Sequence, residues 1–516
     1  MNARPLIAIC GTTGVGKSNF AIELALHLCR SSRNDDWKGA KIINADAMQI
    51  YSGMDVITNK VPESERQGVE HLLMGFKSPG EQYVVGEWVQ DALKAIDETH
   101  KRSEIPIVVG GTSYWIQHLM FPNRLAFDSS SLASGSTTLQ PMSQELTNAI
   151  NSLSSNLFAL FNDLPSNPPS AATDPDAAFD LHTLLSILDP PVANRWHWRD
   201  TRKVLRSLCI IKESGRRASE IIKDQTNDMS ANIPRFRTLC FWLYAEPPVL
   251  EIRLNERVDK MIEQGLLSEI RSLREIAQAA SNKPPSFGVR IGEGMPDVNT
   301  DYTLGIYQSI GYKEFHDYLS ASEPSEKAFK NAIEHMKVST RQYAKRQISW
   351  IRNKLLPAVY AANTEETVTP TFLLDATELG EQWLSGVRDP GIQIMEDFLA
   401  ERELPDPCAL SDNARKMLTI DRKPVDPTSV LNARRKIICT TCTIYPDRPV
   451  MVEEGRERAA HEKTRLHRKL AAKSAHRIQK DQVEQELEEN SVTDSDLSTL
   501  DLNTSYKEIC SIKKTD

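Results

Sequence analysis

The segment GTTGVGKS, residues 11–18, has the residue types and the spacing of a phosphate-binding loop. Its glycines allow successive backbone N–H groups to point into one concavity, and the N-terminus of a following helix would add partial positive charge there. Lys17 can reach a terminal phosphate, and Ser18 can coordinate Mg²⁺. Because an apolar run precedes the loop and a helical pattern follows it, we predict a diphosphate or triphosphate site rather than a chance glycine-rich turn. The residues expected to contact the phosphates are Gly11, Thr12, Thr13, Gly14, Val15, Gly16, Lys17 and Ser18.

Asp46 is a second residue that could do chemistry. It lies in NADAMQIYSGMDVITNK, residues 44–60, at the end of the second predicted strand, where ligands of open α/β sheets bind. A carboxylate at this place could act as a general base. Taken alone, an Asp here is more typical of a helix N-cap or a Mg²⁺ contact. A later apolar run, IPIVVGG, ends in glycines followed by Thr112 and not in the Mg²⁺-binding Asp of an ATPase, so nucleotide hydrolysis is not the obvious outcome.

Two cysteines and two histidines near the C-terminus have the spacing of a metal site, Cys439-x2-Cys442-x18-His461-x5-His467. Two thiolates and two imidazoles form a common tetrahedral Zn²⁺ ligand set. The gap between the pairs is longer than in most fingers, and the alternative is two unrelated pairs in a tail. We predict a Cys2His2 zinc finger, and we expect loss of its metal to unfold only the segment near residues 434–470.

The order of the predicted elements indicates how these residues are positioned. Short apolar runs alternate with helical patterns over residues 1–120, which predicts an α/β fold with a P-loop NTPase-like parallel sheet. Apolar residues then recur at helical spacing, so we expect a mainly helical middle. The expected parts are an α/β core over 1–125, a Ser/Pro-rich, partly disordered insertion over 126–180, a helical region over 181–235, a return to the core with further helices over 236–360, a linker and helical region over 361–430, the finger over 431–472 and an acidic disordered tail over 473–516.

The net charge of −8 is distributed unevenly. Residues 481–508 carry nine acidic residues against one lysine, whereas residues 195–217 carry eight basic residues and residues 337–354 carry six. Basic runs of this kind either meet a phosphate backbone or are solvated helix faces. No apolar run approaches the roughly 18 residues of a membrane span, so we expect no membrane contact. Eight cysteines are too few for a disulfide framework, which points to a reducing compartment.

A series of motifs resembles those of the tRNA dimethylallyltransferases, also called tRNA isopentenyltransferases, and they occur in the family's order. The resemblance covers residues 6–354, and the eukaryotic members of that family carry one finger after the catalytic core. It implies that the loop binds the pyrophosphate of dimethylallyl diphosphate together with Mg²⁺, and that the acceptor is N6 of adenine 37 next to a tRNA anticodon. The motifs are GTTGVGKS, DAMQIYSGMDVITNK, EHLLMGF, VVGGTSYWIQ, DTRKVLRSL, RLNERVDKMIEQGLLSEI, SIGYKEF and STRQYAKRQISWIRNK.

The resemblance also implies roles for individual residues. Asp46 would accept the N6 proton, while Lys17, Thr112 and Arg257 would offset the charge that develops on the departing pyrophosphate, with Ser18 holding Mg²⁺. Arg253, on the same helical face as Arg257, is a weaker candidate. The residues assigned to contact with tRNA are Asp46, Ala47, Met48, Gln49, Arg202, Lys203, Val204, Leu205 and Arg206. We expect Gln49 to hydrogen-bond a base edge, and His71 to be structural.

Three other functions compete with this interpretation. A P-loop kinase or NTPase would explain the phosphate loop but not residues 44–60 or the finger. An adenylate isopentenyltransferase acting on free AMP, ADP or ATP would share most core motifs, but it would leave the finger and the basic runs without a ligand. A zinc-finger scaffold with a degenerate core is disfavoured by the intact candidate residues. We therefore expect a prenyltransferase that binds the tRNA anticodon stem-loop and acts as a monomer in the cytoplasm, with the mitochondrion and nucleus as further compartments.

Overall fold

The computed structural model describes residues 4–30, 37–122, 142–171, 173–227, 233–281, 305–364, 366–420, 435–475 and 482. These residues belong to two compact units. Unit 1 lies within Met1–Leu164, Ile187–Asp189 and Leu205–Val430, and unit 2 lies within Pro165–Ser186, Pro190–Val204 and Leu431–Asp516. Among the helices of the described residues, none is long and apolar enough to span a membrane.

Unit 1 contains a six-stranded sheet with the order β3-β2-β4-β1-β5-β6, in which all neighbouring strands are parallel. The strands are β1 (Pro5–Gly11), β2 (Gly39–Asn44), β3 (His71–Leu72), β4 (Glu104–Val109), β5 (Arg237–Tyr244) and β6 (Thr371–Asp375). The carboxyl ends of β1, β2 and β4, which are neighbours, lie at one edge of the sheet, where open α/β sheets bind ligands. The predicted α/β class with a parallel sheet is confirmed.

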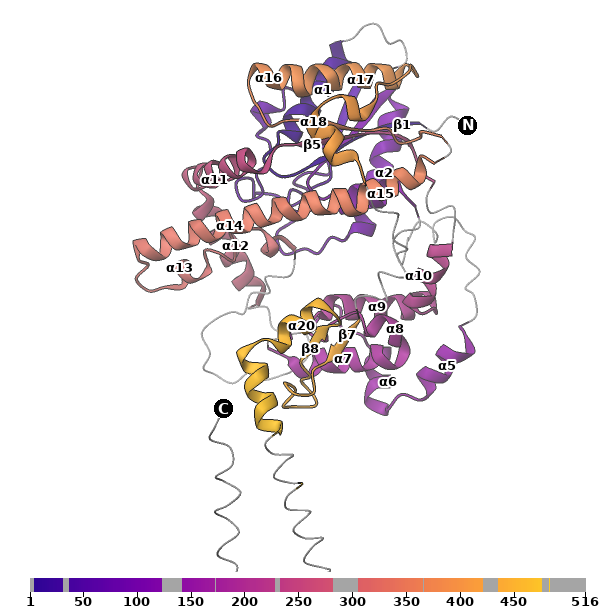
Figure 1. Cartoon of the computed structure of the whole chain (residues 1–516), viewed down its shortest axis with the longest axis vertical. Helices are drawn as coiled ribbons and strands as arrows, with labels where there is room; N and C mark the ends of the chain where they lie inside the picture. The colour runs from indigo at the N-terminus through magenta and orange to yellow at the C-terminus, as the bar shows by residue number, and fades with distance from the viewer. Residues whose placement is uncertain are drawn as a thin grey trace, which may run out of the picture. The chain divides into compact units, whose positions relative to one another are not determined.

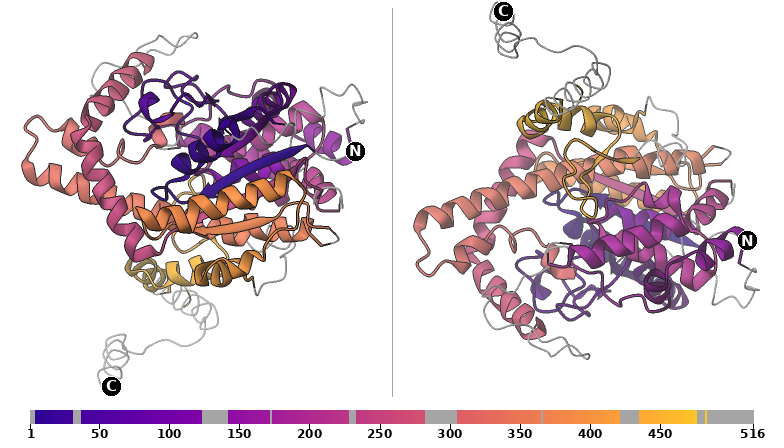
Figure 2. Two further views of the ribbon diagram at one scale, coloured as in Figure 1. Left: turned by 90° about the horizontal axis from the view of Figure 1, so that it is seen from above. Right: turned by 90° about the horizontal axis from the view of Figure 1, so that it is seen from below.

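The central strands are apolar throughout because both faces of the sheet are covered. Every residue of β1 is buried, with Leu6 and Ala8 in one apolar cluster and Ile7 and Ile9 in the other. The first cluster includes residues of α2 (Val85–Lys101) and α3 (Ser113–Met120), and the second includes residues of α1 (Lys17–Arg30) and α17 (Asp389–Leu399). Figure 1 shows α1 and α17 on one side of the strands, and Figure 2 shows the orange helix α17 lying along them.

A long helix, α14 (Glu326–Trp350), is capped at its N-terminus by Ser325, whose hydroxyl accepts a hydrogen bond from the N–H of Ala328. It continues through η4 (Ile351–Leu355) into α15 (Leu356–Ala362), and it packs against α11 (Pro247–Glu263). Lys337, in the basic run 337–354, joins the two helices, because its Nζ lies 2.8 Å from Oδ1 of Asp259 on α11. Further elements of this part are α12 (Leu266–Ser281), η3 (Gly305–Gln308) and α13 (His316–Ser320).

Residues 361–420, within the expected linker and helical region, contain several helices and one strand that was not expected. Their apolar run TFLLD forms β6, which pairs in parallel with β5 and so completes the sheet. A five-residue apolar run cannot be distinguished from a buried helical segment by its periodicity, which explains the misinterpretation. The elements that follow are α16 (Glu381–Trp383), η5 (Leu384–Arg388), α17, η6 (Pro407–Ala409) and α18 (Asp412–Leu418).

The remaining helices and the finger region complete the described chain. Part of the insertion expected over 126–180 is helical, and residues 126–141 of it lie outside the described residues, as does the tail apart from 473–475 and 482. The helices are α5 (Gln144–Asn151), α6 (Ser155–Asn162), α7 (Pro175–Leu188), α8 (Pro190–Ala193), α9 (Thr201–Ser214) and α10 (Ala218–Asn227). In unit 2, β7 (Lys436–Ile438) and β8 (Met451–Glu453) pair in antiparallel orientation before α20 (Arg456–Glu462).

Candidate active site and metal cluster

The predicted phosphate loop connects β1 to α1, as its mechanism requires. Gly14 and Gly16 both have φ of +83°, a conformation that favours glycine. The ammonium group of Lys17 donates a hydrogen bond to the carbonyl oxygen of Thr12 at 2.6 Å. Lys17 is partly accessible to solvent, but protein atoms surround its ammonium group, and this desolvation lowers its pKa to about 8. The loop therefore holds a cation that is poorly solvated until an anion binds.

Asp46 and Arg257 supply the charges that act on Lys17. Desolvation lowers the pKa of Arg257 to about 10, and the negative charge of Asp46 opposes this shift. Asp46 likewise favours the charged form of Lys17, whereas Arg257 disfavours it. The structure thus brings together one carboxylate and two desolvated cations from the ends of β1 and β2 and from α11, an arrangement suited to a diphosphate next to a base.

Local hydrogen bonds hold Asp46 in place. Its Oδ1 accepts from the N–H of Met48 at 3.0 Å, and its own N–H donates to Asn44 Oδ1 at 3.1 Å. The hydroxyl of Thr112 accepts from the N–H of Ala47 at 3.1 Å, which ties the loop after β4 to the loop after β2. All four predicted catalytic residues, Lys17, Asp46, Thr112 and Arg257, therefore belong to one connected site.

Two residues of α14 that the sequence did not reveal also belong to this site. Gln347 is 5% exposed; its Oε1 accepts from the N–H of Thr13 at 2.9 Å, and its Nε2 donates to the carbonyl oxygen of Gly111 at 2.9 Å. Tyr343 hydrogen-bonds to Gln347, and desolvation together with the charge of Asp46 raises the pKa of its hydroxyl. The one available signal was the i, i+4 spacing of Tyr343 and Gln347, two polar residues on one face of a helix.

The loop at residues 44–60 is braced from within and by α12. The carboxylate of Glu269 accepts three backbone N–H groups, those of Asp55, Val56 and Ile57, at 2.8–2.9 Å. Gln49 Nε2 donates to the carbonyl oxygens of Thr58 and Asn59 at 3.2 and 3.1 Å. The NH₂ group of Gln49 thus holds the loop together, which leaves its carbonyl oxygen as the group that could meet a base.

The residues expected on the RNA-binding helix divide into two kinds. Arg202, Lys203 and Arg206 are exposed on α9, so their side chains can meet a phosphate backbone. Val204 and Leu205 are buried and pack in the protein interior. Because both side chains lie on the apolar face of an amphipathic helix, the expected contact of Val204 and Leu205 with tRNA stays a prediction, and the side chains that this helix exposes are the basic ones.

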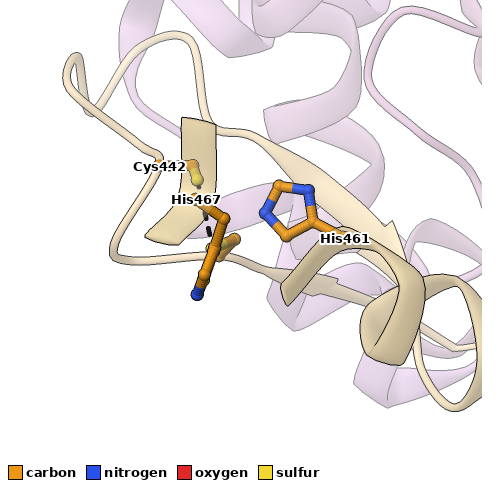
Figure 3. Close-up of side chains that lie close together, drawn as sticks. Cys442, His461 and His467 are labelled. Atoms are coloured by element: carbon orange, nitrogen blue, oxygen red, sulfur yellow. Dashed lines mark hydrogen bonds between the residues drawn. The ribbon is translucent and has the colours of Figure 1, made fainter. Parts of the chain in front are cut away.

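The four predicted metal ligands form a cluster in unit 2. One ligand atom from each of Cys439, Cys442, His461 and His467 lies within 4.8 Å of the others. His467 Nδ1 lies 3.5 Å from Cys439 Sγ and 3.4 Å from Cys442 Sγ, and Figure 3 shows the two imidazoles next to Cys442. His461 Nε2 is buried without a hydrogen-bond partner among the described residues. This donor set could bind a metal ion such as Zn²⁺.

The metal cluster shares a core with the helical part of unit 2. The indole of Trp198 is 1% exposed, and its Nε1 donates to the carbonyl oxygen of Pro449 at 2.9 Å. Trp198 packs in one apolar cluster with Ala178 and with Met451 of β8. The N–H of Lys436 donates to the carbonyl oxygen of Asn194 at 2.6 Å. Unfolding confined to residues 434–470 is therefore not what this packing supports.

Comparisons with known proteins agree with this geometry. The model of the IPP transferase family matches residues 49–354. The chain is a member of the IPP transferase family. It is 34% identical to the tRNA dimethylallyltransferase of Schizosaccharomyces pombe over 92% of this chain and 97% of that protein. It is 32% identical to the enzyme of the same name from Saccharomyces cerevisiae, over 78% of each chain.

A solved structure confirms the family at the level of the fold. It is described as a eukaryotic dimethylallyltransferase acting on tRNA, and it resembles this chain with a TM-score of 0.65 at 28% identity. The similarity covers 93% of this chain and all of the other. The resemblance drawn from the motifs is thereby confirmed, and it extends beyond the residues that the family model matches.

The pKa of Lys17 leads to a pH prediction for this family member. Its ammonium group binds an anion only when protonated, so we expect the affinity for inorganic pyrophosphate to fall as the pH rises through about 8. Above that value the dissociation constant should rise by up to about tenfold per pH unit. Calorimetric titrations with pyrophosphate between pH 6.5 and 9.5 measure this.

Lys17→Arg is the control, because arginine stays charged over this range and reports the ionisation of pyrophosphate alone. Identical pH profiles for the wild type and Lys17→Arg would show that Lys17 does not govern anion binding.

Proposed function

We propose that this chain transfers a dimethylallyl group from dimethylallyl diphosphate to N6 of adenine 37 next to the anticodon of tRNA, giving N6-isopentenyladenosine. The observation that carries the proposal is the convergence of Asp46 with the desolvated Lys17 and Arg257 around the phosphate loop. Relatives that match most of the chain are named tRNA dimethylallyltransferase, which supports the same reaction class.

The proposed step breaks the bond between the allylic carbon and the diphosphate oxygen and forms a bond from that carbon to N6. Adenine N6 is a poor nucleophile because its lone pair is delocalised into the ring, so a positioned base is needed. Asp46 takes the N6 proton, and the cations of Lys17 and Arg257 stabilise the departing pyrophosphate. Thr112 holds the backbone next to Asp46. Ser18, in the first turn of α1, would bind Mg²⁺, which adds positive charge beside the leaving group.

The exposed basic side chains suit a tRNA acceptor better than a free nucleotide. Arg202, Lys203 and Arg206 are exposed on α9. Arg465, Arg468 and Lys469 are exposed in the segment around the metal-ligand candidate His467. An adenylate would leave these groups without a ligand, so the adenylate isopentenyltransferase alternative is disfavoured. The adenine must leave its stack to reach Asp46, at an energetic penalty of a few kcal/mol that phosphate contacts can offset. We further propose a monomeric enzyme of the cytoplasm, with the mitochondrion and nucleus as additional compartments.

We also propose that Zn²⁺ occupies the Cys439, Cys442, His461 and His467 cluster and makes it a structural finger. The proposal is supported by the closeness of the four ligand atoms and by the unpartnered, buried His461 Nε2. Zinc coordination would supply the partner that this nitrogen lacks. Two metal ions are thus proposed for this chain, Mg²⁺ beside the donor and Zn²⁺ in unit 2.

Labelled dimethylallyl diphosphate tests the choice of acceptor. With an anticodon stem-loop RNA containing adenine 37, we expect the label to appear in the RNA, and with AMP we expect none, because AMP engages few of the basic groups. The same RNA carrying guanine at position 37 is the control. Label in AMP at the rate seen with the RNA would favour the adenylate alternative.

Asp46→Ala tests the proposed base. We expect the rate of prenyl transfer at saturating substrates to fall by about 10² to 10⁴, the usual contribution of a positioned base, while tRNA affinity changes little. Single-turnover kinetics and a filter-binding assay measure the two quantities. Asp97→Asn is the control, since Asp97 lies on α2 and pairs with Arg4 and Lys101. Near-normal turnover of Asp46→Ala would remove this role.

Cys442→Ser tests the metal cluster and its shared core. We expect loss of zinc and weaker protection from hydrogen exchange in the backbone around Trp198, because β8 and Trp198 pack together. Pyrophosphate binding by unit 1 should persist. Zinc analysis and hydrogen exchange with mass spectrometry measure these effects, and Cys408→Ser is the control. Unchanged zinc content would contradict the ligand assignment, and loss of protection confined to residues 435–475 would contradict the shared core.

A further inference from the structure

The phosphate loop touches a side chain from a distant part of the chain. A Cβ atom at Gly16 would lie 2.6 Å from Cη2 and 2.9 Å from Cζ3 of Trp383. The edge of the Trp383 indole therefore lies against the backbone of Gly16. Gly16 directly precedes Lys17, and its φ of +83° turns the chain into α1. Contact at this point therefore limits how far the neighbouring peptide groups can move, and the N–H bonds of these groups must face a diphosphate.

The other edge of the same indole is fixed to α1. Trp383 Nε1 donates hydrogen bonds to both carboxylate oxygens of Glu23, at 3.2 and 3.1 Å. Burial raises the pKa of Glu23, whereas the bond from Trp383 and the charge of Arg388 oppose that shift. The hydrogen bond satisfies the buried indole N–H and also fixes the orientation of the ring relative to α1. The indole thus joins the last glycine of the loop to the helix that continues from it.

The segment that carries Trp383 is a fixed part of unit 1. Trp383 ends the short helix α16, and it is 9% exposed within the cluster that contains Phe372, Val387 and Met395. The backbone of α17 approaches α1 closely, because a Cβ at Gly391 would lie 2.4 Å from Phe20 Cζ. Strand β6 is paired along its length with β5. The indole is thus held by the sheet and by α17, and it does not depend on a moving lid.

We infer that Trp383 is a positioning residue for the donor diphosphate. By fixing the backbone at Gly16 between the indole and α1, it keeps the N–H groups of the loop aimed at the phosphate oxygens before the donor arrives. This inference rests on the proposed function for the identity of the donor. A purely structural tryptophan would contribute to the free energy of unfolding without setting affinity for a diphosphate, and this difference separates the two roles.

The test compares Trp383→Ala with Met395→Ala, a truncation in the same apolar cluster on α17. Inorganic pyrophosphate is the probe, and its dissociation constant is measured by calorimetry well below both melting temperatures. We expect Trp383→Ala to weaken pyrophosphate binding by roughly tenfold and to raise the KM for dimethylallyl diphosphate, with the KM for tRNA unchanged. Met395→Ala should lower the melting temperature and leave pyrophosphate affinity near that of the wild type. Equal pyrophosphate affinities in the two variants would overturn the inference.

Milder variants keep the test decisive where Trp383→Ala does not fold. Trp383→Phe keeps an aromatic side chain but loses the N–H and the six-membered ring that lies against Gly16, whereas Glu23→Ala removes only the acceptor, so both should weaken pyrophosphate binding, Glu23→Ala by the smaller factor. The double variant should be no weaker than Trp383→Phe, because both changes remove the same hydrogen bond. Additive losses in the double variant, or wild-type affinity in both single variants, would contradict a positioning role. Absence of prenyl transfer to RNA by the wild type would reject the proposed function alone, since pyrophosphate binding is measured without it.

Discussion

The amide of Gln347 is the contact on which the geometry of the candidate site depends. A phosphate loop and the ends of neighbouring strands approach each other in any parallel α/β sheet, but they are separate pieces of backbone with unpaired polar groups. Gln347 satisfies one such group on each side, the N–H of Thr13 and the carbonyl oxygen of Gly111. Because a side-chain amide has a donor and an acceptor about as far apart as these two groups require, one residue fixes two loops relative to α14. An apolar residue there would leave both groups buried and unsatisfied.

The close approach at Gly111 explains why the loop after β4 is rich in glycine. A Cβ at Gly111 would lie 2.6 Å from Gln347 Nε2 and 3.3 Å from Asp46 Oδ2. Any side chain would therefore displace the amide or the proposed base. The site thus combines polar side chains from α14 with backbone groups of the loop after β4, and the side chain of Asp46 lies close to Gly111 of that loop. Its own hydrogen bonds to Met48 and Asn44 are local, so its position follows from the short sequence NADAM.

The separation along the chain between two contacting residues decides whether their contact could be predicted from the sequence. The phosphate loop, Asp46 and the Cys/His cluster are recognisable because their spacing is local and their chemistry demands particular residue types. Gln347 and Trp383 contact the loop from more than 330 residues away, and the i, i+4 spacing of Tyr343 and Gln347 marks a polar helix face without showing what it contacts. Strand β6 was missed for a related reason, since only its pairing with β5 distinguishes it from a helical segment. Val204 and Leu205 were assigned to tRNA by the family resemblance, whereas the helical period places their side chains in the core.

Two polar groups of the phosphate loop, the hydroxyl of Thr12 and the ammonium group of Lys17, indicate which kind of ligand the loop suits. Thr12 Oγ1 is buried without a partner among the described residues, while Lys17 bonds to the carbonyl oxygen of the same residue. A buried hydroxyl without a partner and a desolvated ammonium group both carry an energetic penalty, of about 1–3 kcal/mol for a group such as the hydroxyl. An anion with several acceptor oxygens would relieve both, since the hydroxyl could donate to it and Lys17 could turn from Thr12 toward it. The polar groups of the loop therefore suit an anion, and Gln347 fixes the backbone at Thr13 next to them.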